Sequence, residues 1–280
     1  WAHVKMFSPF SMNHSPLGIA AIESHHPQHP FPDNDQYITG QQWLDNYLLP
    51  LADTDLLRSC ISTHSRITNV SRTWINKTDL EAEERRNDPF RVVIEQAGEQ
   101  QALTADVVID TSGVLSNPAP IGAGGIPAIG EEKLTDEIAH HIPSISEAES
   151  LKGKKVAVVG AGHSAACALV TLVRAGATVT WVTRGDSRNA LPHIPDDPLG
   201  ERARLVQELR VLLDDNAIQR MPHAAIDSIQ ISDEQNPNSL QLGIYQQDVG
   251  ESNSNANESH TTALTWHSFD RVFGLTGYHV

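Results

Sequence analysis

One stretch limits the folds open to this chain more than any other, the run over residues 155–166, which reads KVAVVGAGHSAA. A short apolar run leads into the pattern G-x-G-x-x-A, an apolar helical pattern follows, and the β-branched run TVTWVT comes next at residues 178–183. Strand, glycine turn, helix and strand within about thirty residues is the arrangement that binds a dinucleotide. The spacing therefore predicts a nucleotide-binding β–α–β unit, and a purely structural unit without a ligand is the alternative.

Each position of the glycine turn has a physical reason in such a site. Gly160 permits the tight turn, Gly162 lets the backbone approach a pyrophosphate, and Ala165 keeps the helix close to the strand. The free N–H groups at the start of the helix face the anion. Ser164 offers a hydroxyl donor, whereas His163 is interpreted as a phosphate neighbour or helix-face residue rather than a catalytic group. The predicted contacts are Gly160, Ala161, Gly162, His163, Ser164 and Ala165.

The end of the second strand indicates which dinucleotide is bound. An NAD site usually carries Asp or Glu about twenty residues beyond the glycines, where the carboxylate binds the ribose 2′-hydroxyl. This chain has Thr183 and Arg184 there, and Arg188 follows a turn later. A guanidinium matches a 2′-phosphate in charge and in fork geometry. We therefore expect NADPH rather than NADH, with Arg184 as the main contact. A solvated loop arginine is the alternative.

Composition excludes several classes of partner. The net charge of −15 argues against nucleic acid and against an anionic membrane surface, because phosphates would be repelled. No apolar run approaches the length needed to span a bilayer. The chain begins at Trp1 rather than at a methionine or signal peptide, and it stops at Val280 just after a strand-like run. We expect a cytoplasmic protein whose sequence here is truncated at both ends.

Cysteine and histidine usage predicts no metal centre. Cys60 and Cys167 are the only cysteines, and they lie far apart in the sequence, so neither a redox-active dithiol nor a zinc site is indicated. The histidines of the proline-rich first 35 residues are His14, His25, His26 and His29. They have no carboxylate or cysteine ligand nearby in the sequence. A surface loop is therefore favoured over a metal site.

Two further runs combine a strand pattern with a glycine. Residues 105–113 read ADVVIDTSG, a buried-strand pattern that stops at a small-residue turn, and residues 269–278 read FDRVFGLTGY. Because glycine has no side chain, a cofactor can come close to the backbone at the end of each run. Because the pair flanks the central nucleotide unit, it suggests chain crossings between two stacked domains. The proline-rich stretch 118–130, which contains GAGG, is interpreted as a connector, since no helix follows it directly.

With these three motifs in order, the chain resembles the flavoproteins with two dinucleotide-binding domains. This group includes flavin-dependent monooxygenases and thioredoxin-reductase-like oxidoreductases that use FAD and NAD(P)H. The resemblance implies an α/β fold, in which a Rossmann-like parallel-sheet NAD(P)-binding domain is inserted in an incomplete FAD-binding domain. Residues 119–269 would form the NAD(P)H-binding domain, and residues 1–118 with 270–280 a partial FAD-binding domain. The first glycine motif of the group, which holds FAD, would lie before Trp1.

The resemblance also implies cofactors and contacts. FAD and NADP would be the cofactors, and the residues near FAD would be Ile67, Thr111, Gly113, Thr276 and Gly277. NADPH would pass a hydride to FAD, giving a monooxygenase-like enzyme that acts on a small-molecule substrate. The missing dithiol argues against disulfide reduction. A flavin or electron-transfer reductase without oxygenation, and a nucleotide-binding module without turnover, are the alternatives. No side chain is identified as a catalytic acid, base or nucleophile. Flavoproteins of this kind often pair, which makes a homodimer one expectation.

Overall fold

The computed structural model describes residues 1–76, 78–79, 82–187, 190–233, 236–247 and 263–278, so Arg188 lies outside the described residues. The chain divides into two compact units. Unit 1 comprises Trp1–His14, Phe31–Asn46 and Val114–Val280, and unit 2 comprises Ser15–Pro30 and Tyr47–Gly113. Unit 1 contains the glycine turn. Each unit is described by itself below.

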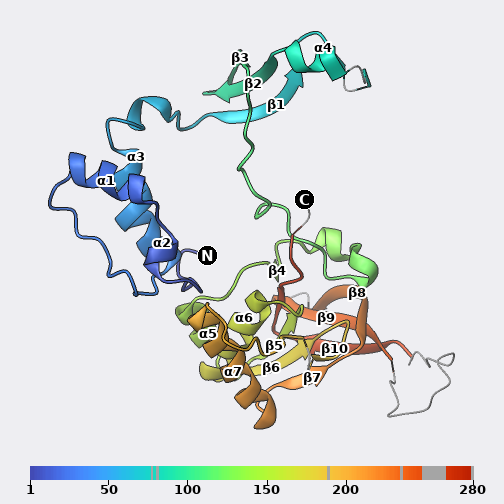
Figure 1. Ribbon diagram of the computed structural model, residues 1–280. Coiled ribbons are helices and arrows are strands. Elements are labelled where there is room, and N and C mark those ends of the chain that lie inside the picture. Colours follow the sequence, from blue (N-terminus) through green and yellow to red (C-terminus); the bar gives the residue numbers. More distant parts are fainter. Residues whose placement is uncertain (77, 80–81, 188–189, 234–235, 248–262, 279–280) are drawn as a thin grey trace. The chain divides into compact units, whose positions relative to one another are not determined.

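A five-stranded parallel sheet is the centre of unit 1 (Figure 1). Its middle strand is formed by the apolar run before the glycine turn, whose Val156, Ala157 and Val158 are completely buried. A strand buried on both faces reads as a continuous apolar run rather than an alternating one. The order across the sheet is β4 (Ile138–Ala139), β11 (Arg271–Gly274), β5 (Lys155–Val159), β6 (Thr178–Val182) and β7 (Gln219–Met221). The expected α/β class with a Rossmann-like parallel sheet is confirmed.

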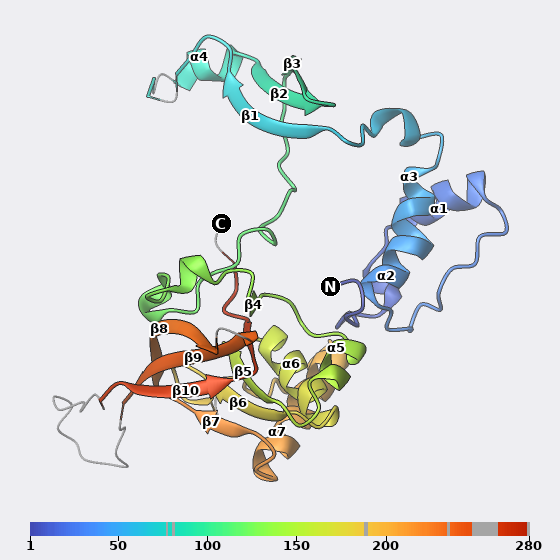
Figure 2. The same cartoon turned by 180° about the vertical axis from the view of Figure 1, so that it is seen from behind.

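The two faces of this sheet are covered by different layers (Figure 2). Val156 and Val158 point into a core shared with the helical layer, whereas Ala157 and Val159 belong to a second core shared with an antiparallel sheet. This alternation is the two-residue period of a strand. The helices are α5 (Ile145–Ser150), α6 (His163–Arg174) and α7 (Gly200–Asp214). The antiparallel sheet is β8 (Ala224–Asp233), β9 (Asn236–Gln246) and β10 (Thr265–Phe269), in the order β10-β9-β8.

Smaller elements of unit 1 lie in its N-terminal segments and in the connector before the parallel sheet. A 3-10 turn η1 (Phe10–Met12) and a short helix α2 (Gly40–Trp43) come first. Thr39 begins α2 with a reciprocal capping box that involves Gln42. The connector contains the 3-10 turns η4 (Ala123–Gly125) and η5 (Glu131–Lys133). A π-helical turn η2 (Leu44–Leu48) carries the chain from unit 1 into unit 2.

A buried carboxylate fixes the shape of the connector. Glu131 is 4% exposed, and its two carboxylate oxygens accept hydrogen bonds from the backbone N–H groups of Ile121 at 2.8 Å and Ala128 at 2.7 Å. The interaction closes the proline- and glycine-rich loop onto itself and places Ile121 in the second core. The segment that the sequence indicated as a linker is therefore an ordered loop.

We expect Glu131→Gln to destabilise unit 1 by about 1–3 kcal/mol, because one of two buried N–H groups loses its acceptor. Chemical unfolding followed by tryptophan fluorescence measures this change. Glu132→Gln, at the exposed neighbouring position, is the matched control and should change stability by less than about 0.5 kcal/mol. Equal effects of the two substitutions would show that Glu131 does not hold the loop.

Unit 2 combines short helices with a three-stranded antiparallel sheet. The helical part is α1 (Pro16–His25), α3 (Leu49–Ala52) and η3 (Arg58–Cys60). At the start of α1, the hydroxyl oxygen of Tyr47 accepts a hydrogen bond from the backbone N–H of Ser15 at 3.0 Å. The sheet, in the order β1-β2-β3, is β1 (Arg66–Arg72), β2 (Phe90–Gln96) and β3 (Glu99–Ala105), with α4 (Ala82–Asn87) between β1 and β2.

One expected strand is wrong. Residues 106–113 form no strand, and the apolar side chains of Val107 and Ile109 are 73% and 80% exposed rather than buried. β3 ends at Ala105, and the segment beyond it pairs with no described strand. An apolar, β-branched run becomes a buried strand only where neighbouring strands supply hydrogen-bond partners and cover its faces. The described residues supply no such neighbour, so the run stays open to solvent.

Among the described residues, no helix combines the length and apolar character that crossing a bilayer requires.

Candidate nucleotide site

The glycine turn lies at the carboxyl end of β5, where β5 passes into α6. Gly160 has a φ of +125°, and a Cβ atom built there would lie 2.2 Å from the carbonyl oxygen of Leu275, which follows β11. Only glycine fits such a conformation beside a backbone so near. The indole N–H of Trp181 on β6 donates to the Gly160 carbonyl at 2.6 Å. The turn is thus held between the two strands that flank β5.

The second glycine begins α6 and leaves it without a cap. Gly162 is the N-cap residue, and it provides no side-chain cap for the first turn of the helix. A Cβ atom at Gly162 would meet nothing within 4 Å, so the space beside this residue is open. Ala165, by contrast, is completely buried against the core. Uncapped N–H groups and the positive end of the helix dipole form a site suited to a phosphate anion.

A cavity of about 250 Å³ opens beside this turn, at the carboxyl ends of the parallel strands. In open α/β sheets this edge is where ligands bind. The turn contributes Gly160 and Ala161, and the end of β6 contributes Val182, Arg184 and Gly185. The opposite wall comes from the connector and from the segment after β11. Its members are Pro120, Ile121, Gly122, Ala123 and Thr276. The structure therefore brings Gly160, Ala161, Arg184 and Thr276 into one cleft.

The two residues predicted at the end of β6 lie in different environments. Thr183 is 2% exposed, and its hydroxyl donates to the carbonyl of Gly185 at 2.8 Å, so this side chain is used within the fold. Arg184 is exposed, lines the cleft and pairs with no other described residue. No carboxylate occupies the position at which an NAD site places one. Among the described residues that line this cleft, Arg184 is the one that carries a positive charge.

His163, the first residue of α6, lies in a partly closed environment. Its ring packs edge-on against Phe7, with ring centroids 5.5 Å apart. Burial, assisted by the positive charge of Arg202 and opposed by Asp197, lowers the pKa of His163, which keeps the imidazole neutral at pH 7. Asp197 and Arg202 form a two-pronged ion pair, with Oδ–N distances of 2.6 and 2.8 Å. The hydrogen bonds from Arg202 lower the pKa of Asp197 to about 2.

The residues expected near FAD are distributed over both units. Thr276 and Gly277 belong to unit 1, where the Thr276 hydroxyl donates to the carbonyl of Ala119 at 2.6 Å. Gly277 has a φ of +101°, and the space where its Cβ would lie is open. Ile67, Thr111 and Gly113 belong to unit 2; all three are exposed, Ile67 on β1 and the other two in the extended segment after β3.

The two cysteines are free thiols in different units. Cys60 is exposed in unit 2, whereas Cys167 lies on α6 in unit 1. Burial raises the pKa of the Cys167 thiol to about 11, which leaves it protonated and a poor nucleophile at neutral pH. Within these 280 residues, therefore, the sequence supplies no dithiol motif, and Cys167 is a packing residue.

Several residues of the site were not anticipated from the sequence. The connector residues Ile121, Gly122 and Ala123 form a wall of the cleft, and Phe7 covers His163. Asp197 and Arg202 approach the start of α6 from the beginning of α7. One feature of the sequence could have indicated an ordered connector. The acidic pair Glu131 and Glu132 follows the glycines of the connector, and Glu131 closes the loop.

A three-layer unit with a glycine turn at the carboxyl edge of its parallel sheet defines a dinucleotide-binding protein of the Rossmann type. The family model described as pyridine nucleotide-disulphide oxidoreductase matches residues 2–242. The chain belongs to this family of flavoprotein oxidoreductases. A search by sequence among curated proteins gives no match.

Solved structures share the fold at low sequence identity. The bacillithiol disulfide reductase of Bacillus cereus matches with a TM-score of 0.63 and 18% identity over 99% of this chain and 65% of its own. The Staphylococcus aureus bacillithiol disulfide reductase matches with a TM-score of 0.61 and 16% identity over 100% of this chain and 64% of its own. The chain thus spans slightly less than two thirds of the length of these two proteins.

Proposed function

We propose that this chain binds NADPH at the glycine turn and acts in an NADPH-dependent FAD oxidoreductase. The observation that carries the proposal is the uncapped start of α6, which faces open space beside a cleft at the carboxyl edge of the sheet. The family match supports the use of FAD and a pyridine nucleotide. Residues 119–269 would be the NAD(P)H-binding domain, and residues 1–118 with 270–280 a partial FAD-binding domain.

Different residues of the cleft are proposed to contact different parts of the nucleotide. The N–H groups of His163, Ser164 and Ala165 would hold the pyrophosphate, with the Ser164 hydroxyl as a further donor. Arg184 would pair with the 2′-phosphate, since a guanidinium matches a phosphate in charge and geometry. His163, kept neutral by burial, adds no charge of its own. When both cofactors are bound, NADPH supplies a hydride to the flavin, and the protein provides binding and orientation.

The proposed FAD contacts depend on backbone segments that carry no bulky side chain. Gly277 fits a flavin edge, because its positive φ and its lack of neighbours leave the backbone open to close approach. Thr276 would accompany it at the end of β11. Ile67, Thr111 and Gly113 are proposed as the contacts that unit 2 contributes.

Two versions of this function differ in what accepts the electrons of the reduced flavin: a reductase without oxygenation, and a monooxygenase-like enzyme. The family match and the names of the two bacillithiol disulfide reductases favour a reductase without oxygenation. The cysteines favour the monooxygenase-like version. Cys60 and Cys167 lie far apart in the sequence, so these 280 residues carry no dithiol motif that could exchange with a disulfide. Oxygen consumption coupled to an oxygen atom in the product would distinguish the monooxygenase. We propose a small-molecule substrate and a homodimeric assembly in both versions.

Anaerobic mixing of the FAD-loaded full-length protein with NADPH tests the proposed function. We expect the absorbance of oxidised flavin near 450 nm to fall at a rate that saturates with NADPH, because hydride transfer follows binding. A matched reaction with free FAD and no protein gives the background rate. NADPH binding without any flavin reduction would contradict the oxidoreductase and favour a nucleotide-binding module.

A further inference from the structure

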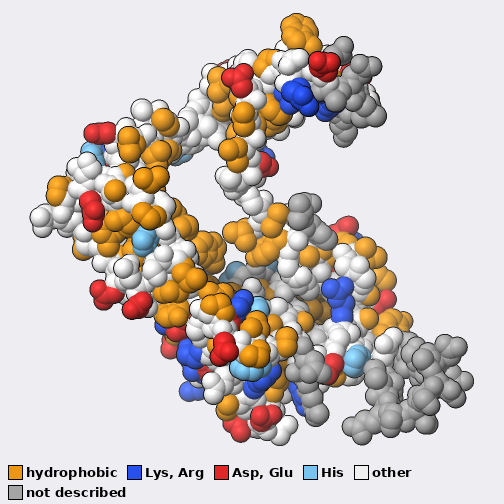
Figure 3. Space-filling model, in the orientation of Figure 1, with side chains coloured by type: hydrophobic (Ala, Val, Ile, Leu, Met, Phe, Trp, Pro, Cys, Tyr) orange, Lys and Arg blue, Asp and Glu red, His pale blue; other side chains and the backbone are white. Residues whose placement is uncertain are grey.

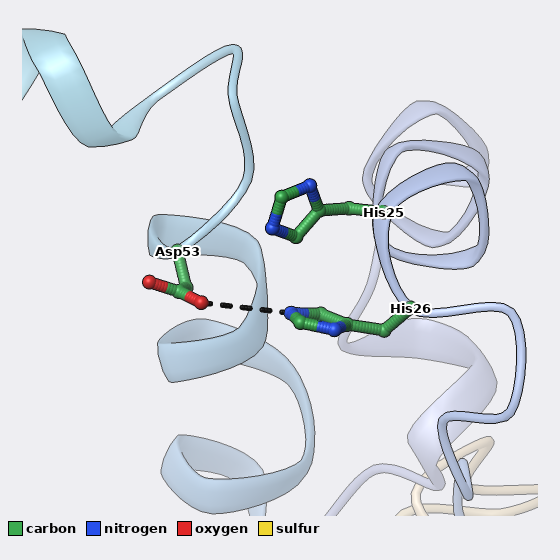
Figure 4. A group of neighbouring side chains, drawn as sticks. All are labelled: His25, His26 and Asp53. Carbon is green, nitrogen blue, oxygen red and sulfur yellow. Dashed lines mark ion pairs between the residues drawn. The ribbon is translucent and has the colours of Figure 1, made fainter.

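Two histidines and an aspartate that are distant in the sequence meet in unit 2. His25 is the last residue of α1, His26 follows it, and Asp53 follows the last residue of α3. One potential ligand atom from each of these residues lies within 4.8 Å of the other two. Figure 4 shows both imidazole rings facing the carboxylate of Asp53. The sequence alone did not predict this cluster, because its carboxylate comes from a segment almost thirty residues further along the chain.

The side chains around the cluster hold it in a form suited to an ion. Asp53 uses Oδ1 to accept from Nε and Nη2 of Arg58, at 3.1 and 2.7 Å. Its other oxygen, Oδ2, lies 3.5 Å from Nε2 of His26. The Arg58 contact therefore fixes the carboxylate and leaves Oδ2 directed at the histidines.

A second carboxylate lies near His25. Its Nδ1 lies 3.6 Å from Oδ1 of Asp55. A histidine that binds a metal through one ring nitrogen usually directs the other at a carboxylate, which fixes the tautomer and the ring orientation. The His25 and His26 rings pack edge-to-face, with centroids 4.4 Å apart at 82°, so that they do not stack over each other.

The spacing suits a divalent ion after small side-chain rotations. Two ligands at about 2.0–2.1 Å from a tetrahedral Zn²⁺ lie roughly 3.3 Å apart. The three ligand atoms here already lie within 4.8 Å of one another. The side chains of His25, His26 and Asp53 are 25%, 42% and 52% exposed, which leaves room for water at the remaining position.

We propose that His25, His26 and Asp53 bind a divalent transition-metal ion of the Zn²⁺ type, which joins the end of α1 to the end of α3. Imidazole nitrogen with a single carboxylate oxygen suits Zn²⁺, Ni²⁺ or Cu²⁺, whereas Mg²⁺ and Ca²⁺ take sites built from oxygen ligands. The site belongs to unit 2 and does not depend on the nucleotide site in unit 1.

Titration of the full chain, free of any polyhistidine tag, with Zn²⁺ in a calorimeter tests the site. We expect one ion per chain, a melting temperature that rises with Zn²⁺, and no displacement of Zn²⁺ by a large excess of Mg²⁺. Replacing Zn²⁺ with Co²⁺ should give the intense visible bands of four-coordinate Co²⁺. His26→Gln and Asp53→Asn should each weaken Zn²⁺ binding at least about tenfold, since each removes a ligand.

His64→Gln is the matched control, because His64 is an exposed histidine of unit 2 outside the cluster. This substitution should leave Zn²⁺ affinity unchanged within about twofold. Circular dichroism of each variant without metal checks that the fold is retained. Equal weakening by His64→Gln and His26→Gln, or unchanged affinity in Asp53→Asn, would overturn the proposed site and indicate adventitious binding to surface histidines.

Discussion

Gly160→Ala should lower the free energy of unfolding of unit 1 by at least about 3 kcal/mol relative to the parent chain. Two costs add at this position. A non-glycine residue with positive φ costs about 1–3 kcal/mol. The new Cβ would also lie 2.2 Å from the Leu275 carbonyl oxygen, so β5 and β11 would have to separate. Thermal and denaturant unfolding of the purified variant measure the loss.

A second glycine in the same unit separates the two costs. Gly153 also has a positive φ, +74°, but a Cβ atom there would meet nothing within 4 Å. Gly153→Ala should therefore show the conformational cost alone, about 1–2 kcal/mol. If both substitutions destabilise unit 1 equally, the close approach of β11 to the glycine turn does not contribute to its stability.

Arg184→Ala should weaken NADPH binding about 10–100-fold and leave NADH binding nearly unchanged. Loss of hydrogen bonds to a charged group costs about 1.5–3 kcal/mol, which corresponds to this range. NADH lacks the 2′-phosphate and is therefore an internal control for damage to the rest of the cleft. Fluorescence titration with each nucleotide at the same ionic strength measures both affinities.

The Arg184 effect must also be distinguished from a general change in charge. Arg210 is an exposed arginine on α7 in the same unit, outside the nucleotide cleft. Arg210→Ala removes the same charge and should change NADPH affinity by less than about twofold, because Arg210 does not line the cleft and salt screens exposed charges. Equal losses for NADPH and NADH in Arg184→Ala would contradict an assignment of Arg184 to the 2′-phosphate.

Local patterns predicted the centre of unit 1 well. The apolar run of β5, the glycine turn and α6 follow from the two-residue strand period and the special conformation of glycine, which are properties of neighbouring residues. The same pattern reading was wrong for residues 106–113. Burial of Val107 and Ile109 would require partner strands from elsewhere, and the run itself carries no information about them.

Contacts between distant segments were the features that sequence patterns could not supply. The connector was interpreted as a linker because its glycines precede no helix, yet Glu131 folds it into a wall of the cleft. The histidines near residue 25 were not predicted as metal ligands because no carboxylate lies near them in the sequence, and the fold brings one close in Asp53, which follows α3. In both cases one side chain, the buried Glu131 or the exposed Asp53, meets segments whose proximity only the fold determines.

NADPH affinity of Gly162→Val tests most directly whether α6 receives the pyrophosphate. The φ of −90° at Gly162 is open to valine, and its Cβ would enter free space, so the melting temperature should change little. The side chain would fill the room in front of the helix start that a pyrophosphate needs. We predict at least about a 100-fold loss of NADPH affinity in a folded variant. NADPH affinity within about threefold of the parent chain would contradict binding at this turn.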